Sequence, residues 1–197
     1  MLAPDPDRRW TYKDYCAWPE GERWELIDGV AYAMVPAPSR WHQEASSDLL
    51  YLFRRALEGK PRKVYAAPFD VRLGPAEADD DDITTVVQPD LMVFCKPERL
   101  DDKGAHGAPD LAVEILSPSN PQHDTLRKRK LYEQHGVREY WIVDTANRRI
   151  YRMNLEGGRF GDPVEAGNGE TLQSALFPEI RADIDALFPP PPPAPHP

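Results

Sequence analysis

Two carboxylates and one lysine are the residues of this chain best suited to do chemistry together. Asp90 lies in the apolar run VVQPDLMVF (residues 86–94), and Glu114 lies in a second run, PDLAVEILS (109–117). A carboxylate among aliphatic, strand-forming residues is costly to bury unless a cation binds it. Lys128 follows closely on a stretch of helical character. This order predicts a divalent-metal site that cuts a phosphodiester.

Each of the three residues would have its own role in that reaction. Asp90 and Glu114 would supply hard oxygen ligands for Mg²⁺ (or Mn²⁺), which keeps several of its waters and asks only one or two carboxylates of a protein. Lys128 would orient or deprotonate the attacking water, or stabilise the charge on the attacked phosphate.

The position of Lys128 on its helix supports an inward orientation. At about 100° per residue, Lys128 lies angularly between Leu131 and Tyr132, on the main apolar face of the helix. A lysine aimed at a sheet needs a carboxylate partner. The alternative is an ordinary surface ion pair between Lys128 and Asp124, one turn earlier.

The elements that must position these residues follow from turn signals and apolar periodicity. An Asp-Gly pair at residues 28–29, between two apolar runs, is a strong signal for a two-residue β-hairpin. Helices are predicted over residues 12–18, 42–57, 121–135 and 184–188, and strands over 23–27, 30–35, 63–67, 69–73, 86–94, 111–116, 139–144 and 149–154. We expect one α/β (α+β) domain over residues 1–188 and a Pro-rich, disordered tail over 189–197.

Composition excludes several other classes of protein. The net charge of −9 argues against a general nucleic-acid coat protein, but not against a nuclease whose acidic residues bind metal. An acidic run at residues 79–82 is best explained as a solvated loop. Two isolated cysteines, Cys16 and Cys95, argue against a disulfide framework. There is no signal peptide and no apolar stretch of roughly 18 residues, so we expect a cytoplasmic protein with no membrane partner.

Four motifs, in order, carry a resemblance to a known family. They are WELIDG, QPDLMVF, PDLAVEILSPSN and KRKLYEQHGVREYWIVD, spread over roughly residues 24–144. Together they resemble the Uma2 family (DUF820) of restriction endonuclease-like proteins, in the PD-(D/E)xK nuclease superfamily. The resemblance implies an α-β-β-β-α-β core around a central mixed sheet, here with an added N-terminal β-hairpin.

The resemblance also assigns roles to individual residues. Asp90 matches the metal-binding aspartate, and Glu114 matches the acidic residue of the second half-motif. Leu116 stands where the superfamily pattern has its lysine, which implies that Lys128 takes over that role, with Lys130 as the fallback.

Glu25 is the fourth catalytic candidate, because it matches an acidic position that could reach the same metal. Besides Lys130, three other residues are accessory candidates, and the resemblance allows the first of them, His42, near the site. Gln88 shares a strand face with the metal-binding aspartate, and Asp110 shares one with the glutamate. The alternatives are that His42 packs on Trp41, that Gln88 is a strand-edge amide, and that Asp110 satisfies a strand end.

The leading hypothesis is a Mg²⁺-dependent endonuclease acting on DNA, with RNA as a second candidate substrate. A homodimer is expected from the resemblance, with edge strands or the Tyr140–Trp141 region as its interface. The competing hypothesis is a non-catalytic nucleic-acid-binding or interaction protein that keeps the fold. A hydrolase of small phosphorylated molecules ranks lower, because no phosphate-cradling loop is visible.

Overall fold

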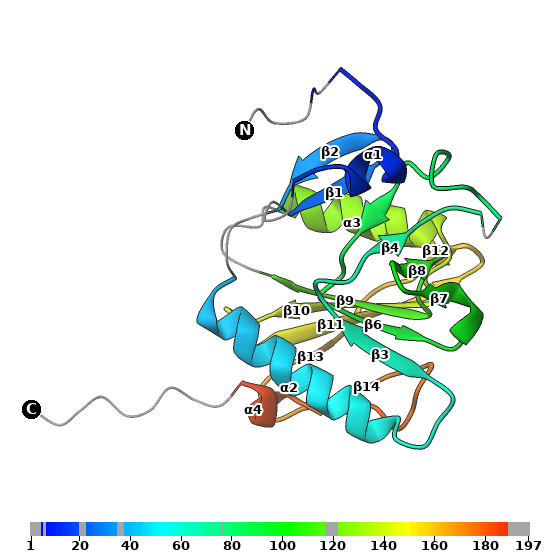
Figure 1. The fold of residues 1–197 in the computed structure, drawn as a ribbon. Coiled ribbons are helices and arrows are strands. Elements are labelled where there is room, and N and C mark those ends of the chain that lie inside the picture. Colours follow the sequence, from blue (N-terminus) through cyan, green and yellow to red (C-terminus); the bar gives the residue numbers. More distant parts are fainter. Residues whose placement is uncertain are drawn as a thin grey trace, which may run out of the picture.

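A mixed β-sheet with a helix on each face forms the centre of the computed structural model (Figure 1). The structure describes residues 5, 7–19, 23–34, 38–75, 77–116 and 122–188, without the side chains of 122–124. In chain order, the core elements are α2 (Arg40–Ala56), β3 (Lys63–Ala66), β6 (Leu91–Phe94), β9 (Leu111–Leu116), α3 (Gln122–Gln134) and β10 (Glu139–Asp144). This order confirms the predicted α-β-β-β-α-β core.

The pairing within this central sheet is mixed. Strand β10 runs parallel to β9, whereas β9 with β6 and β6 with β3 are antiparallel. The sheet is extended beyond β10 by β11 (Arg149–Glu156), β12 (Arg159–Phe160) and β13 (Val164–Ala166). A parallel pair needs a crossover connection, and α3 supplies it between β9 and β10.

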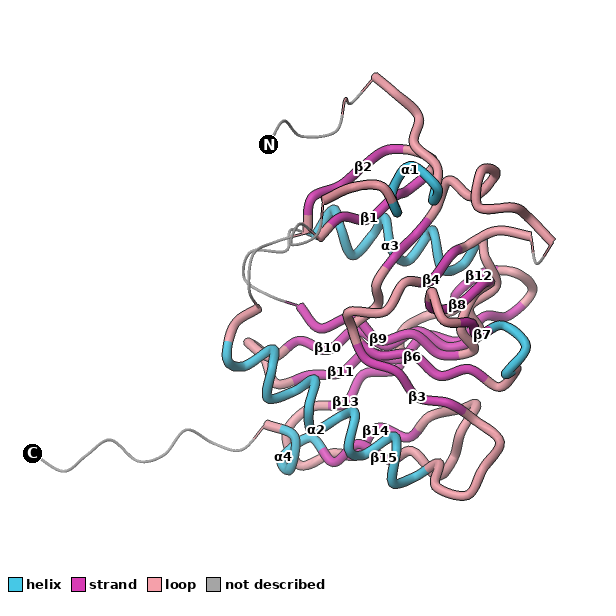
Figure 2. The backbone as a smooth tube through the Cα atoms, viewed as in Figure 1, coloured by secondary structure: helices cyan, strands magenta, loops and turns pink. Residues whose placement is uncertain are grey.

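A second sheet carries the predicted N-terminal hairpin and lies on the α3 side of the molecule (Figure 2). Its strands are β1 (Trp24–Ile27), β2 (Val30–Ala33), β4 (Val71–Arg72), β5 (Val86–Val87), β7 (Leu100–Asp101) and β8 (Gly104–His106). Asp28 and Gly29 both have positive φ, 51° and 77°, as a type I′ hairpin turn requires. The hairpin is therefore confirmed, whereas β7 and β8 were not predicted.

The remaining elements are short, and all but the mid-chain helix η1 lie near the two ends of the described chain. They are α1 (Tyr12–Cys16), η1 (Pro97–Arg99), β14 (Thr171–Gln173), β15 (Arg181–Asp183) and α4 (Ile184–Leu187). The Pro-rich tail at 189–197, the predicted strand end at Val35 and the predicted helix start at Pro121 lie outside the described residues. Among the helices that the structure describes, none combines the length and the apolarity that crossing a bilayer requires.

The prediction of one strand over residues 86–94 is wrong. The run divides into β5, in the second sheet, and β6, in the central sheet. Pro89 lies at the break, and a proline has no N–H to donate to a strand ladder. Asp90 therefore lies where the chain passes from one sheet to the other, rather than in the middle of a strand.

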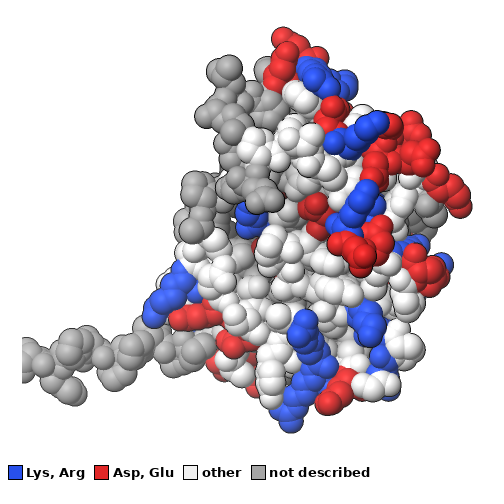
Figure 3. Space-filling model, viewed as in Figure 1, with Lys and Arg blue, Asp and Glu red and all other residues white. Residues whose placement is uncertain are grey.

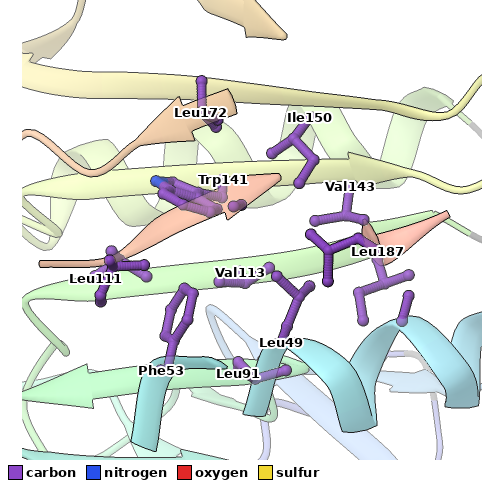
Figure 4. Close-up of a cluster of buried hydrophobic side chains, with 14 of the residues drawn as sticks. Leu49, Phe53, Leu91, Leu111, Val113, Trp141, Val143, Ile150, Leu172 and Leu187 are labelled. Carbon is purple, nitrogen blue, oxygen red and sulfur yellow. The ribbon is translucent and has the colours of Figure 1, made fainter. Parts of the chain in front are cut away.

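Alternate residues of the central strands face two separate cores. The core on the α2 side contains, among others, Leu49, Phe53, Leu111, Val113 and Trp141 (Figure 4). The core on the α3 side contains Ala112, Tyr132 and Tyr140. Glu114 follows the same alternation as Ala112, so its side chain is directed toward α3.

The Tyr140–Trp141 region cannot supply a dimer interface. Both side chains are fully buried inside this chain, Tyr140 in one core and Trp141 in the other. The Trp141 ring packs edge-on against Phe53, with centroids 5.5 Å apart. This part of the homodimer expectation is therefore wrong.

Candidate active site

Asp90 connects three elements of the fold. One carboxylate oxygen, Oδ2, accepts a hydrogen bond from the backbone N–H of Ile115 at 2.7 Å, and the other, Oδ1, lies 3.2 Å from His42 Nε2. His42 occupies the first turn of α2, where its own N–H donates to the capping Ser39 hydroxyl. Asp90 is thus fixed beside Glu114 on β9, and the structure brings the two predicted carboxylates and His42 together.

Lys128 points from α3 into the interior. Its Nζ lies 2.6 Å from Glu25 Oε1 and 3.1 Å from Glu114 Oε1, and its side chain is only 4% exposed. The lysine is therefore not at the helix surface, as the ion pair with Asp124 would require. The side chain of Asp124 itself lies outside the described ones.

Glu25 joins the site through the lysine and through a backbone group. Its Oε1 accepts both from Lys128 Nζ and, at 2.9 Å, from the N–H of Gln88. The side chain of Gln88 turns away from this contact and bridges Arg23 and Asp70. Gln88 therefore acts on the site through its backbone, which holds Glu25.

The electrostatics of this cluster favour the uptake of positive charge. Burial, helped by the negative charges of Asp90 and Glu25, raises the pKa of Glu114 to about 7 against the attraction of Lys128. Carboxylates that repel one another in a poorly solvated site are stabilised by a cation.

The negative charges of the cluster raise the pKa of His42 as they raise that of Glu114, whereas burial acts on the two groups in opposite directions. Burial alone would lower the pKa of His42, but its hydrogen bond to Asp90 and the charges of Asp90 and Glu114 raise it overall. Its Nδ1 is buried and has no hydrogen-bond partner within the described part of the chain. The raised pKa favours the protonated imidazole, which orients Asp90 through their 3.2 Å contact.

Two accessory candidates lie apart from the cluster. Asp110 accepts from the N–H of Cys95 at 2.8 Å and lies 3.2 Å from Arg138 Nη1, so it satisfies the end of a strand. Lys130 is exposed on α3, and within the described residues it has no ion pair with a carboxylate of the site. The structure therefore favours Lys128 over Lys130.

Tyr132 is a residue of the site that sequence reasoning did not identify. Its buried hydroxyl donates to Glu114 Oε1 at 2.5 Å, the same oxygen that Lys128 contacts. The helical spacing could have predicted its position, because Tyr132 comes four residues after Lys128 and lies on the same face of the helix.

We expect the Tyr132→Phe variant to lower the free energy of unfolding by about 1.5–3 kcal/mol, the usual range for a hydrogen bond to a charged group. Tyr12→Phe is the matched control, because Tyr12 is equally buried but its hydroxyl lies 3.5 Å from the neutral carbonyl of Lys103. Urea unfolding near pH 8 measures both variants, and equal losses would contradict the special role of Tyr132.

The donor set is suited to a hard cation. No group of three or more His, Cys, Asp or Glu side chains in the described chain is arranged as a ready metal cage. Asp90 and Glu114 are nevertheless the two-carboxylate set that Mg²⁺ requires when water fills its other positions. The two carboxylates also suit Mg²⁺ better than zinc, for which nitrogen and sulfur ligands are usual.

Three comparisons relate this chain to known proteins. A family model described as "Uma2: Putative restriction endonuclease" matches residues 12–185. An uncharacterized protein of Synechocystis sp. (strain PCC 6803) is 29% identical over 167 residues, which cover 80% of this chain and 83% of the relative. A crystal structure from Anabaena variabilis, described as a "putative nuclease belonging to DUF820", superposes with a TM-score of 0.71 at 18% identity, covering 90% of this chain and 97% of that one. The structural match supports the fold.

Proposed function

The chain belongs to the Uma2 restriction-endonuclease family, and we propose that it is a Mg²⁺-dependent endonuclease that hydrolyses phosphodiester bonds of DNA. Family membership and the nuclease-like fold support an endonuclease. The metal, the substrate and the residue roles are our proposal. The observation that carries it is the position of Lys128 Nζ, buried between Glu25 and Glu114, while Asp90 accepts from the backbone N–H of Ile115, the residue after Glu114.

The proposed roles follow from these contacts. Asp90 and Glu114 would hold the ion, which when bound supplies positive charge for the attacked phosphate and lowers the pKa of a bound water. Lys128 orients the attacking water or stabilises the phosphate, and Glu25 holds the ammonium group in place through their 2.6 Å contact. His42 orients Asp90 through their 3.2 Å contact.

A cleavage assay tests this function directly. Purified protein is incubated with supercoiled plasmid, linear duplex, single-stranded DNA and RNA, in Mg²⁺, in Mn²⁺ and in EDTA. Asp90→Asn is run in parallel, with Asp110→Asn as the matched control, because both aspartates follow a proline and both lie near a strand end.

We expect cleavage that depends on the metal and is lost in Asp90→Asn but kept in Asp110→Asn. Equal cleavage by the wild type and Asp90→Asn would indicate a contaminating nuclease and contradict the assignment. No cleavage of any substrate, together with retained DNA binding, would favour the competing hypothesis of a non-catalytic nucleic-acid-binding protein.

The affinity for Mg²⁺ is expected to fall as the pH drops below about 7. Burial raises the pKa of Glu114 to about 7, so at lower pH a proton occupies the carboxylate and must leave when the ion binds. The apparent association constant then decreases by up to about tenfold per pH unit. Calorimetric titration of the wild type without DNA, between about pH 6 and 8, measures the slope. An affinity that does not change over this interval would contradict Glu114 as a ligand.

The assembly and location remain proposals as well. A homodimer would present two sites to the two strands of a duplex, and light scattering of the purified protein measures whether it forms. A cytoplasmic location stays a prediction from the sequence.

A further inference from the structure

Arg23 is an exposed arginine held in a fixed position beside the site. It immediately precedes β1, the strand that carries Glu25. Its Nε and Nη2 both donate to Gln88 Oε1, at 3.3 and 2.7 Å. Two bonds to one acceptor restrict the guanidinium, which would otherwise move freely at the surface.

The acceptor that holds Arg23 is itself fixed. Gln88 is only 8% exposed, and its Nε2 donates to Asp70 Oδ1 at 2.8 Å and to the Tyr15 hydroxyl at 3.2 Å. With the amide nitrogen bound on that side, the oxygen must face Arg23. A buried network therefore directs an exposed cation.

Among the described residues, no direct partner neutralises the charge of Arg23. Its partner Gln88 is neutral, and within the described residues no carboxylate forms an ion pair with the guanidinium. A guanidinium has five N–H donors, of which the two bonds to Gln88 engage only two. The other donors are available to an anion.

Arg23 also lies within electrostatic reach of the catalytic cluster. The backbone N–H of Gln88 donates to Glu25, and the side chain of Gln88 accepts from Arg23. Gln88 therefore links Arg23 to Glu25 through hydrogen bonds.

The charge distribution makes such a local cation important. The chain has a net charge of −9, and acidic side chains gather at the upper right of Figure 3, over the loop between β4 and β5 that holds residues 79–82. The N-terminal end of α2, which bears His42, lies on the opposite side of this view. A polyanion approaching the site therefore meets little general attraction and depends on individual cations.

We propose that Arg23 binds a phosphate of the nucleic-acid backbone next to the bond that is cut. This inference rests on the proposed nuclease function and extends it to a substrate-binding residue. The planar guanidinium can donate two parallel hydrogen bonds to phosphate oxygens, a geometry that lysine cannot reproduce. Gln88, Asp70 and Tyr15 would then serve as the positioning network for this contact.

The test measures DNA binding and its dependence on salt. Fluorescence anisotropy with a labelled duplex of about 30 base pairs is recorded in a Glu114→Gln background, in Mg²⁺, so that binding is observed without cleavage. Arg23→Ala, Arg23→Gln and Arg23→Lys are compared with Arg181→Ala. Arg181 is the matched control, because it is also exposed but lies on β15, near the other end of the chain. Arg23→Gln keeps a side-chain N–H that can donate to Gln88, so it replaces the alanine variant if that variant is unstable.

We expect Arg23→Ala and Arg23→Gln to weaken binding about tenfold and to reduce the slope of log K against log salt by about 0.9, the loss of one phosphate contact. Arg23→Lys should keep the slope but bind more weakly than arginine, and Arg181→Ala should change neither quantity. In the cleavage assay without the Glu114 substitution, Arg23→Ala should raise KM more than it lowers kcat.

Two results would overturn the inference, and they are distinguishable. If the wild type cleaves DNA but Arg23→Ala and Arg181→Ala show the same slope and KM, the Arg23 contact is wrong and the nuclease function stands. If the wild type neither binds nor cleaves any nucleic acid, the proposed function fails and the Arg23 contact fails with it.

Discussion

The Glu114→Gln variant is expected to lose DNA cleavage by about 10³-fold or more while remaining as stable as the wild type near pH 8. Glutamine keeps the shape of the side chain and an oxygen that can accept from Lys128 and Tyr132, but it cannot supply a charged ligand to Mg²⁺. Loss of activity without loss of stability is typical of a residue selected for chemistry rather than for folding.

The pH dependence of stability gives this variant a second readout. Burial raises the pKa of Glu114 from 4.5 to about 7 in the folded protein, so the folded state binds more protons than the unfolded state between these values. The Glu114 contribution to stability is therefore fully present below about pH 4.5 and is lost as the pH rises through 7. Without metal, the melting temperature of the wild type should fall relative to Glu114→Gln between about pH 5 and 8.

Thermal unfolding in EDTA at several pH values measures this difference, with cleavage assayed on the same samples. A difference in melting temperature that stays constant with pH would mean that Glu114 is ionised throughout and that its environment is less apolar than the structure indicates. Cleavage retained by Glu114→Gln would remove the residue from the proposed mechanism.

The parts of the fold that the sequence predicted are those with strong local signals. The Asp-Gly turn, the apolar strands β9 and β10 and the helix between them were predicted closely, because alternation and turn chemistry act over neighbouring residues. The β7–β8 pair was missed because strands of two or three residues have no measurable periodicity. The division of residues 86–94 was missed although Pro89 was the available signal.

In the site, too, only the features that follow from local sequence patterns could be predicted. The inward orientation of Lys128 follows from helical spacing, and Tyr132 could have been found in the same way. The link from Arg23 to Gln88 spans 65 residues of sequence, and the ion pair between Glu25 and Lys128 spans 103. Such contacts depend on how two sheets and a helix meet in space, which no local pattern contains.

Replacing Lys128 with methionine is expected to damage both activity and stability. The substitution leaves Glu25 and Glu114 as two nearly buried carboxylates without the cation that lies 2.6 and 3.1 Å from them. Breaking a buried pair in this way costs about 3–5 kcal/mol, because an uncompensated charge remains inside. Cleavage should fall by about 10²- to 10³-fold in addition, the usual effect of removing one group that stabilises a transition state.

The loss of stability should depend on pH and on Glu25. Protonation of Glu114 relieves the repulsion, so Lys128→Met should be less destabilised near pH 6 than near pH 8. The double variant Lys128→Met/Glu25→Gln removes one of the two charges and should recover most of the stability but none of the activity. A coupling energy close to zero in this double-mutant cycle would contradict the ion pair.

The control variant separates the two lysine assignments made from the sequence. Lys130→Met changes an exposed lysine two positions further along the same helix, so its stability should stay within about 0.5 kcal/mol of the wild type. If Lys130→Met lost cleavage while Lys128→Met retained it, Lys130 would be the catalytic lysine and Lys128 would serve only to neutralise Glu25 and Glu114. Because Lys128 is the lysine of the two that contacts Glu114, the carboxylate proposed as a metal ligand, we expect the opposite result.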